Sequence, residues 1–222
     1  ASTDSGTGRW TVIKIPTLSF YEYCQLLQLD DMPLLPDHLK ITDIPKMENA
    51  EVADLMARFE PLVKHFNRYL TIGGFPELAL SDDDLYAQRM LREDVVDKVI
   101  KRDVLTLFKV RSPLLMEKLF LYLCMNSTEI FSATTAAKEL DNISPNTIES
   151  YVDALVKSNL IYMAYPIAVG SKSVLKGRPK IYIADAAIRN AVLMVDDVLS
   201  DERELGLLIE TTVYKHLVSF YQ

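Results

Sequence analysis

The segment SPNTIESYVDALVKSNLIYMAY, residues 144–165, decides the fold that we predict for this chain. Ser144 followed by Pro145 predicts a helix start, because a serine hydroxyl can cap an early amide and proline is favoured at the first helical position. Apolar residues then recur at helical spacing, and Asn159 predicts a left-handed stop. Leu160 to Tyr165 has the composition of a strand. A helix that runs directly into a strand is typical of the third helix and first wing strand of a winged helix-turn-helix.

The flanking segments supply the other elements of this module. Pro113 to Met125 has the periodicity of a first helix, and Thr134 to Leu140 is a short, alanine-rich second helix. Gly170 to Lys180 has the glycine, serine and lysine content of an exposed hairpin tip, and Ile181 to Ile183 returns as the partner strand. We expect residues 184–195 to form one helix that closes the unit.

The first half of the chain predicts helices after a single short strand. Thr11 to Ile15 alternates like a strand, and one strand cannot bury both faces or satisfy its own backbone, so we expect further strands upstream. Ser19 predicts the cap of a helix, and Asn49 to Leu70 predicts a helix broken near Pro61. Gly73 to Pro76 predicts a sharp structural turn before a long helix.

Composition predicts a soluble protein with a sizeable core. The chain has 222 residues, of which 49% are hydrophobic, enough for two structural units. It contains no apolar run long enough to span a membrane and no secretory signal pattern, which predicts a cytoplasmic location without membrane partners. Cys24 and Cys124 each lie in an apolar helical pattern and are predicted to be buried thiols. The three histidines are scattered and predict no metal site.

The net charge of −7 argues against a protein dominated by non-specific phosphate binding. If nucleic acid binds, a local basic patch must bind it. Residues 196–222 are the most acidic part, with six acidic and two basic side chains.

Five segments in a fixed order resemble a large family of bacterial and archaeal AAA+-type ATPases. They are GRWxxIKIPxLSFYEY, YLxxGGFPE, a helix ending in KRD, the winged helix, and LLIETTVYKHL. In that family a winged-helix domain of unknown function follows the ATPase module, and a restriction-endonuclease-like domain follows the winged helix. The resemblance implies a mainly α fold: a helical AAA+ lid and then a winged helix-turn-helix with a short β-hairpin wing.

The same resemblance implies the domain boundaries. Residues 1–18 would be a remnant of the last strand of the AAA+ core, 19–111 the helical lid, 112–195 the winged-helix domain, and 200–222 the start of a truncated C-terminal, nuclease-like domain. The intact protein would bind ATP and Mg²⁺. This chain contains no GxxxxGK[ST] loop and no apolar strand ending in paired acids, so by itself it holds no cofactor and should not hydrolyse ATP.

Arg9 is the one candidate for a direct role in catalysis. By resemblance, an arginine at this place reaches the γ-phosphate of a neighbouring subunit as an arginine finger in trans. The alternative is a solvated arginine in the polar leader.

The predicted wing carries the candidate nucleic-acid-binding residues Lys172, Lys176, Arg178 and Lys180, with no acidic residue among them. Such a wing could lie along a phosphate backbone and bind with salt-sensitive, sequence-independent affinity. The alternative is a plain exposed hairpin.

The predicted third helix argues against insertion into a DNA groove. It presents Glu149 and Asp153 to solvent, and these carboxylates repel phosphates. Asn146 and Thr147, at its N-terminus, could still contact bases. Glu210 could join a metal-binding acidic cluster in a nuclease-like domain, although a surface glutamate is the plainer interpretation.

We therefore interpret the chain as the C-terminal part of a AAA+ ATP-binding protein, with a winged helix able to contact DNA or a partner. Its expected partners are the missing nucleotide-binding core, DNA through the wing, and further copies of itself. Two alternatives stay open: a winged-helix transcriptional regulator that binds DNA, and a protein-interaction module that binds no nucleic acid.

Overall fold

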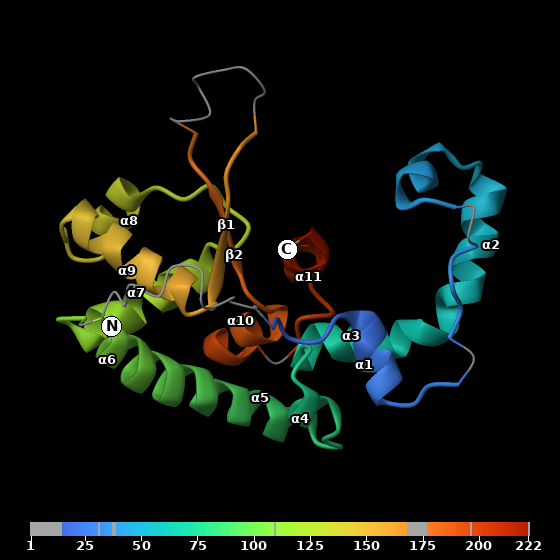
Figure 1. Cartoon of the computed structure of the whole chain (residues 1–222), viewed down its shortest axis with the longest axis horizontal. Coiled ribbons are helices and arrows are strands. Elements are labelled where there is room, and N and C mark those ends of the chain that lie inside the picture. Colours follow the sequence, from blue (N-terminus) through green and yellow to red (C-terminus); the bar gives the residue numbers. More distant parts are fainter. Residues whose placement is uncertain are drawn as a thin grey trace, which may run out of the picture.

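The computed structural model describes residues 15–30, 32–36, 39–108, 110–167, 177–195 and 197–221. This part of the chain is mainly helical and contains one small two-stranded antiparallel sheet, as the sequence predicts. Helices α1 to α4 lie on one side, the long helix from α5 to α6 runs to the other side, and the β-hairpin rises beside α11 (Figure 1). The predicted strand Thr11–Ile15 lies outside the described residues except for Ile15, which is irregular and exposed.

Helices of the first half begin and end close to where the sequence predicts. Ser19 caps the first helix in a reciprocal capping box with Glu22, and the long helical segment breaks at Pro61. The elements are α1 (Phe20–Leu26), η1 (Ile41–Lys46), α2 (Asn49–Phe59), η2 (Glu60–Leu62), α3 (Val63–Ile72) and α4 (Pro76–Ala79).

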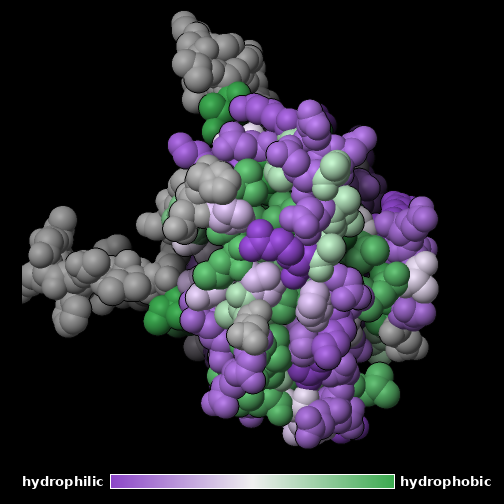
Figure 2. Space-filling model, turned by 90° about the vertical axis from the view of Figure 1, so that its right-hand side faces the viewer, coloured by the Kyte–Doolittle hydropathy of each residue, from purple (hydrophilic) through white to green (hydrophobic). Residues whose placement is uncertain are grey.

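Helix α2 extends away from the rest of the molecule (Figure 1) and buries none of its residues, all of which are described. We call α2 and the segment around Leu34 that contacts it the arm. Leu34 and Met56 in the arm are 61% and 69% exposed. Figure 2, which views this side, shows hydrophobic side chains emerging between polar ones rather than one continuous apolar patch. The arm is therefore held by its own local contacts, such as the hydrogen bond from Arg58 to Leu34 O.

A long helix then crosses the molecule. It consists of α5 (Asp84–Arg92), a π-helical continuation η3 (Glu93–Val104) and a final turn α6 (Leu105–Leu107). Asp83 caps its start by accepting a hydrogen bond from Tyr86 N–H. Near its C-terminal end, the exposed side chains of Arg102 and Asp103 form an ion pair with an N–O distance of 3.0 Å.

The second half has the element order that the sequence predicts for a winged helix. Three helices precede a hairpin whose register pairs Ile161 with Ile183 and Ala164 with Lys180. The next helix closes the unit, and a last helix follows it. The elements are α7 (Pro113–Met125), α8 (Ala133–Glu139), α9 (Pro145–Lys157), β1 (Ile161–Ala164), β2 (Lys180–Ile183), α10 (Ala186–Leu193) and α11 (Glu202–Tyr221).

Two local predictions about α9 have different outcomes. Asn159 has a φ of 56°, which confirms the left-handed stop. The predicted side-chain cap by Ser144 is wrong, because its hydroxyl forms no capping hydrogen bond with the described residues. Instead the Ser144 carbonyl accepts from the N–H groups of Thr147 and Ile148, at 2.9 and 3.2 Å, so the backbone alone starts the helix.

One continuous hydrophobic core joins the two halves. Val104 on η3, Leu119 on α7 and Ile188 on α10 belong to the same cluster of buried side chains. Helix α10 lies at its centre and contacts α3, α5 and α7. The segments that we predict to be lid and winged helix are therefore packed against each other through this core.

Both cysteines are buried free thiols, as predicted. None of the described helices is long and apolar enough to cross a membrane.

Candidate functional site

Asp185 and Lys215 form a fully buried ion pair between α10 and α11. The Lys215 Nζ lies 2.7 Å from the Asp185 Oδ2, and both side chains are only 3% exposed. Asp185 is in place because it caps α10, accepting a hydrogen bond from Ala187 N–H at 3.0 Å. Lys215 is in place because it lies on the face of α11 that packs inward with Leu208.

Two segments from the first half complete this site. The Thr17 hydroxyl donates to Asp185 Oδ2 at 2.6 Å, and Gly74 N–H donates to the same oxygen at 3.2 Å. Lys215 also donates to Leu18 O and to the Tyr69 hydroxyl, both at 2.9 Å. We call Thr17, Leu18, Tyr69, Gly74, Asp185 and Lys215 the buried joint.

The charges in the buried joint are fully compensated. Burial alone would raise the pKa of Asp185, but the Lys215 ammonium, with hydrogen bonds from Lys215, Thr17 and Ala187, holds that pKa below its ordinary value. All three Lys215 donors are used. Burial, with the nearby Asp185 charge, raises the pKa of Tyr69, which therefore stays a neutral hydroxyl that donates to Leu18 O at 2.6 Å.

The predicted turn Gly73–Pro76 is structural because the buried joint leaves no room for side chains there. Gly73 has a φ of +76°, and a Cβ on it would lie 2.8 Å from the Ala187 Cβ. A Cβ on Gly74 would lie 2.8 Å from Leu18 N and 2.9 Å from Lys215 Nζ. Both glycines allow the turn to approach α10 and the segment before α1.

His216 adds a contact beside the buried joint. Its Nε2 accepts from Phe20 N–H at 2.8 Å, and its Nδ1 lies 2.7 Å from Thr212 O. This arrangement requires a neutral ring with the proton on Nδ1. Burial lowers the pKa of His216, and Lys215 lowers it further.

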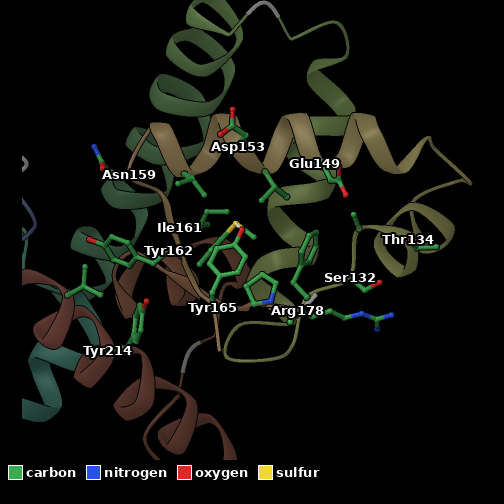
Figure 3. A pocket seen from close by; sticks show the side chains of 18 residues that line it. Ser132, Thr134, Glu149, Asp153, Asn159, Ile161, Tyr162, Tyr165, Arg178 and Tyr214 are labelled. Atoms are coloured by element: carbon green, nitrogen blue, oxygen red, sulfur yellow. Dashed lines mark hydrogen bonds between the residues drawn. The ribbon is translucent and has the colours of Figure 1, made fainter. Parts of the chain in front are cut away.

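A groove of about 760 Å³ lies between α9 and the hairpin (Figure 3). Val152 and Val156 of α9 and Met163 of β1 give it an apolar floor. The rims are polar or aromatic and carry Glu149, Asp153, Asn159, Tyr162, Tyr165, Arg178 and Tyr214. We call it the edge groove, because it follows β1 from one face of the hairpin to the other.

The structure places some of the predicted nucleic-acid-binding residues and leaves others undescribed. Arg178 is exposed at one end of the edge groove. Asn146 is exposed and Thr147 half-buried at the start of α9. Lys172 and Lys176, like Arg9, lie outside the described residues.

Lys180 and Glu210, which the sequence assigns to different functions, contact each other. Lys180 Nζ lies 2.9 Å from Glu210 Oε1, and the Tyr182 hydroxyl donates to the same oxygen at 2.9 Å. No group of three or more possible ligand residues lies close enough to hold a metal ion in the described ranges. The roles predicted for Lys180 and Glu210 stay predictions, with both side chains in a contact that joins the hairpin to α11.

Sequence reasoning missed the buried joint. No role was assigned to Asp185 or to Lys215 from the sequence. Two signals were usable: Lys215 follows Thr211 and Thr212 at helical spacing, and two glycines are adjacent in GGFPE. Both belong to segments that carry the family resemblance.

Comparisons with known proteins give a family without an assigned activity. A family model described as a domain of unknown function, DUF8612, matches residues 63–199. An uncharacterised protein of Haemophilus influenzae is 24% identical over 187 residues, which is 82% of this chain and 40% of that protein. Two uncharacterised proteins of Methanocaldococcus jannaschii are 24% and 30% identical, over 81% and 72% of this chain and 40% and 33% of their own lengths.

The chain thus spans about two fifths or less of the length of the curated relatives that it matches. No solved structure matches it significantly.

Proposed function

The chain belongs to the DUF8612 family, and from this premise we propose that it is the lid and winged-helix part of a AAA+-type ATPase. Its function in that protein is to transmit motion. A displacement of the segment before α1, which we assign to the end of the nucleotide-binding core, is passed to the winged helix and to α11.

The observation that carries this proposal is the buried joint. Its residues come from the segment before α1, the end of α3 and the turn after it, the cap of α10, and α11. Groups buried in a satisfied network hold one geometry, because moving any member leaves a buried charge or polar group unpaired. Together with the continuous core, this favours movement of lid and winged helix as one rigid body.

ATP and Mg²⁺ do not fit the described residues. No phosphate-binding loop occurs in the sequence, and no cluster of possible metal ligands occurs in the described ranges.

The outer face of α11 supports the proposal that residues 200–222 begin another domain. Ile209, Val213, Leu217 and Phe220 follow one another at helical spacing and are between 38% and 80% exposed. The opposite face already packs on the buried joint. An exposed apolar stripe on a helix whose other face is already packed is typical of an interaction surface.

The first test compares this chain with the full translation product of its gene, using a fluorescent ATP analogue with Mg²⁺. We expect the full product to bind the analogue and this chain alone not to bind it. Binding by this chain, or none by the full product, would overturn the assignment.

The second test measures rigid-body movement. Spin labels at Leu85 on α5 and Met125 on α7, which are 72% and 63% exposed, report the distance between lid and winged helix. We expect the same distance distribution in the full product with and without Mg·ATP. A nucleotide-dependent shift would show that the two parts do not move as one.

Arg9 has its own test in the full product. As an arginine finger it would act on hydrolysis, so Arg9→Ala should lower the rate by about 10³-fold or more while nucleotide binding stays within about twofold. Arg58→Ala, in the exposed arm, is the matched control. If the Arg9 variant and the wild type hydrolyse ATP at the same rate, Arg9 is not an arginine finger but a solvated residue of the polar leader.

A protein-interaction role for α9 is the second candidate, and the charges around the edge groove favour it over DNA binding. Glu149 and Asp153 are exposed there, and Lys180 is engaged by Glu210. With random duplex DNA we expect only weak, sequence-indifferent mobility shifts that disappear as salt rises. Preference for one sequence would instead support a transcriptional regulator.

A further inference from the structure

We propose that the edge groove binds an extended peptide segment with alternating basic and apolar side chains, which pairs with the free edge of β1. This deepens the protein-interaction role of α9 and does not depend on nucleotide binding.

The hydrogen bonds of β2 show which edge of the hairpin is unpaired among the described residues. Ile181 N–H donates to Glu129 O at 3.1 Å, and Ile181 O accepts from Thr128 N–H at 2.7 Å, so Ile181 directs its backbone groups away from β1. In an antiparallel ladder the groups of successive residues alternate in direction. Lys180 and Tyr182 therefore direct their backbone N–H and C=O groups towards β1.

The register then fixes the direction of the β1 backbone. Tyr162 and Ala164 pair with Tyr182 and Lys180, so they direct their N–H and C=O groups towards β2. Met163, between them, directs its groups outward. No described strand pairs with that outer edge. A strand edge of this kind accepts an added strand through main-chain hydrogen bonds.

The edge groove lies along this free edge. Ile161, Tyr162, Met163 and Tyr165 all line it, which includes both faces of β1. Figure 3 shows α9 on one side of the hairpin and Tyr214 of α11 on the other. Its volume of about 760 Å³ falls within the range of ligand-binding clefts, about 300–1,000 Å³.

The side facing α9 suits long basic side chains. Val152 and Val156 form an apolar surface on which the aliphatic stems of lysine or arginine can lie. Glu149 and Asp153, one helical turn apart, place carboxylates at the rim above this surface. Asp153 also contacts Lys157 at 2.6 Å, so Glu149 is the rim carboxylate that forms no ion pair with another described residue.

The opposite side suits apolar side chains. Tyr162 and Val218 are half-buried there, with Tyr214, whose ring lies 6.2 Å from that of Tyr162. Side chains of an added strand point alternately towards α9 and towards α11, so the bound peptide should alternate basic and apolar residues. A phosphate backbone would bring negative charge against Glu149 and Asp153, which argues against nucleic acid in this groove.

The test uses a fluorescein-labelled Val-Arg-Val-Arg-Val-Arg peptide with blocked ends and the full 222-residue chain without nucleotide. We expect saturable binding, with the amide resonance of Met163 shifted and its hydrogen exchange slowed. A Val-Glu-Val-Glu-Val-Glu peptide should bind at least tenfold more weakly. No saturation by the arginine peptide up to about 1 mM, or equal binding of both peptides, would overturn the proposal.

Methylation of the peptide amides tests pairing with the strand edge. In a bound strand, all three arginine N–H groups face one way and all three valine N–H groups face the other. Methylating one set should weaken binding at least tenfold, whereas methylating the other should change it less than threefold. Equal effects would show that the peptide does not pair with β1.

Charge-removing variants test the assignment to the rim. Glu149→Gln with Asp153→Asn should weaken binding of the arginine peptide by about fivefold, as expected for two exposed ion pairs. Glu139→Gln, an exposed site on α8 that does not line the groove, is the control. If the double variant binds the peptide unchanged, or if duplex DNA displaces the peptide competitively, the groove has a different ligand.

Discussion

Helix α11 is attached to the rest of the molecule by two lysine–carboxylate pairs with similar lengths and very different surroundings. Lys215 and Asp185, 2.7 Å apart, are each 3% exposed. Lys180 and Glu210, 2.9 Å apart, are each 43% exposed. Both pairs connect α11 to the hairpin and the helix that follows it.

The difference in burial separates two physical roles. A buried pair has lost its water, so removing one partner leaves an uncompensated charge in a low-dielectric interior. Water and salt already solvate and screen an exposed pair, so removing one partner changes little. The buried joint should therefore fix the position of α11, and the Lys180–Glu210 pair should only add a weak contact.

The largest expected effect follows from breaking the buried joint. Lys215→Met leaves Asp185 buried without its counter-ion, and we expect a loss of about 3–5 kcal/mol in the free energy of unfolding. Urea unfolding followed by circular dichroism measures it. This loss is a large fraction of the stability of a typical domain.

The control replaces both charges. Asp185→Asn with Lys215→Met removes the uncompensated charge, so the double variant should be more stable than Lys215→Met alone. It should also unfold cooperatively even if Lys215→Met does not fold. If the losses in the free energy of unfolding from the two single substitutions add up to the loss in the double variant, the two charges do not interact. If Lys215→Met loses less than about 1 kcal/mol, the Asp185–Lys215 pair stabilises the fold no more than an exposed ion pair does.

A change in backbone packing should have the next largest effect. The Cβ of Gly74→Ala would lie within 3 Å of Leu18 N and Lys215 Nζ, so we expect a loss of about 1–3 kcal/mol from overpacking. Gly206→Ala is the matched control, because its Cβ would meet no described atom within 4 Å. On α11 it should stabilise the chain by up to about 1 kcal/mol, since alanine favours helix. Equal effects of the two substitutions would show that Gly74 is not tightly packed.

Local signals were sufficient for most of the elements. Ser19, Pro61 and Asn159 act within a few residues of their own position, so the helix boundaries that they predict are present. The hairpin was predictable because its strands are adjacent to a strong helix pattern. The Ser144 cap failed because the Ser144 carbonyl, and not its hydroxyl, receives the first amides of α9.

The buried joint was not predictable in the same way. Thr17, Gly74, Asp185 and Lys215 lie far apart in the sequence, and no local pattern states which helix faces meet. Burial of a lysine depends on a partner that only the folded chain supplies. The edge groove was not predictable either, because its lining comes from α9, β1 and α11, whose relative positions are set only in the folded chain. The sequence did predict that its acidic residues Glu149 and Asp153 face solvent.

His216 predicts a smaller, pH-dependent effect beside the buried joint. Its pKa is lowered below the ordinary 6.5, so below that pH the unfolded chain binds a proton that the folded chain does not. The free energy of unfolding should therefore fall as pH decreases from about 7 to 5, by at most about 1.4 kcal/mol per pH unit. Asp185 stays ionised throughout this range, because its pKa is below its ordinary 3.8.

Variants separate this contribution from that of the second affected histidine. His216→Gln can still accept from Phe20 N–H, so it should fold and lose most of the pH dependence. His65→Gln removes the other described histidine whose pKa is lowered, mainly by burial. If His216→Gln retains the wild-type slope while His65→Gln abolishes it, the contact with Phe20 has no role in the pH dependence.

The smallest effect should come from the Lys180–Glu210 pair. Glu210→Gln removes the charge but keeps an acceptor for the Tyr182 hydroxyl, so we expect a loss below about 1 kcal/mol that shrinks further at high salt. Burial, together with Glu210, raises the pKa of Tyr182 to about 12. A spectroscopic titration of the tyrosines should therefore show a lower pKa for Tyr182 in the variant. A loss comparable to that of Lys215→Met would mean that the exposed contact fixes α11 as strongly as the buried one, and that the difference in burial does not separate their roles.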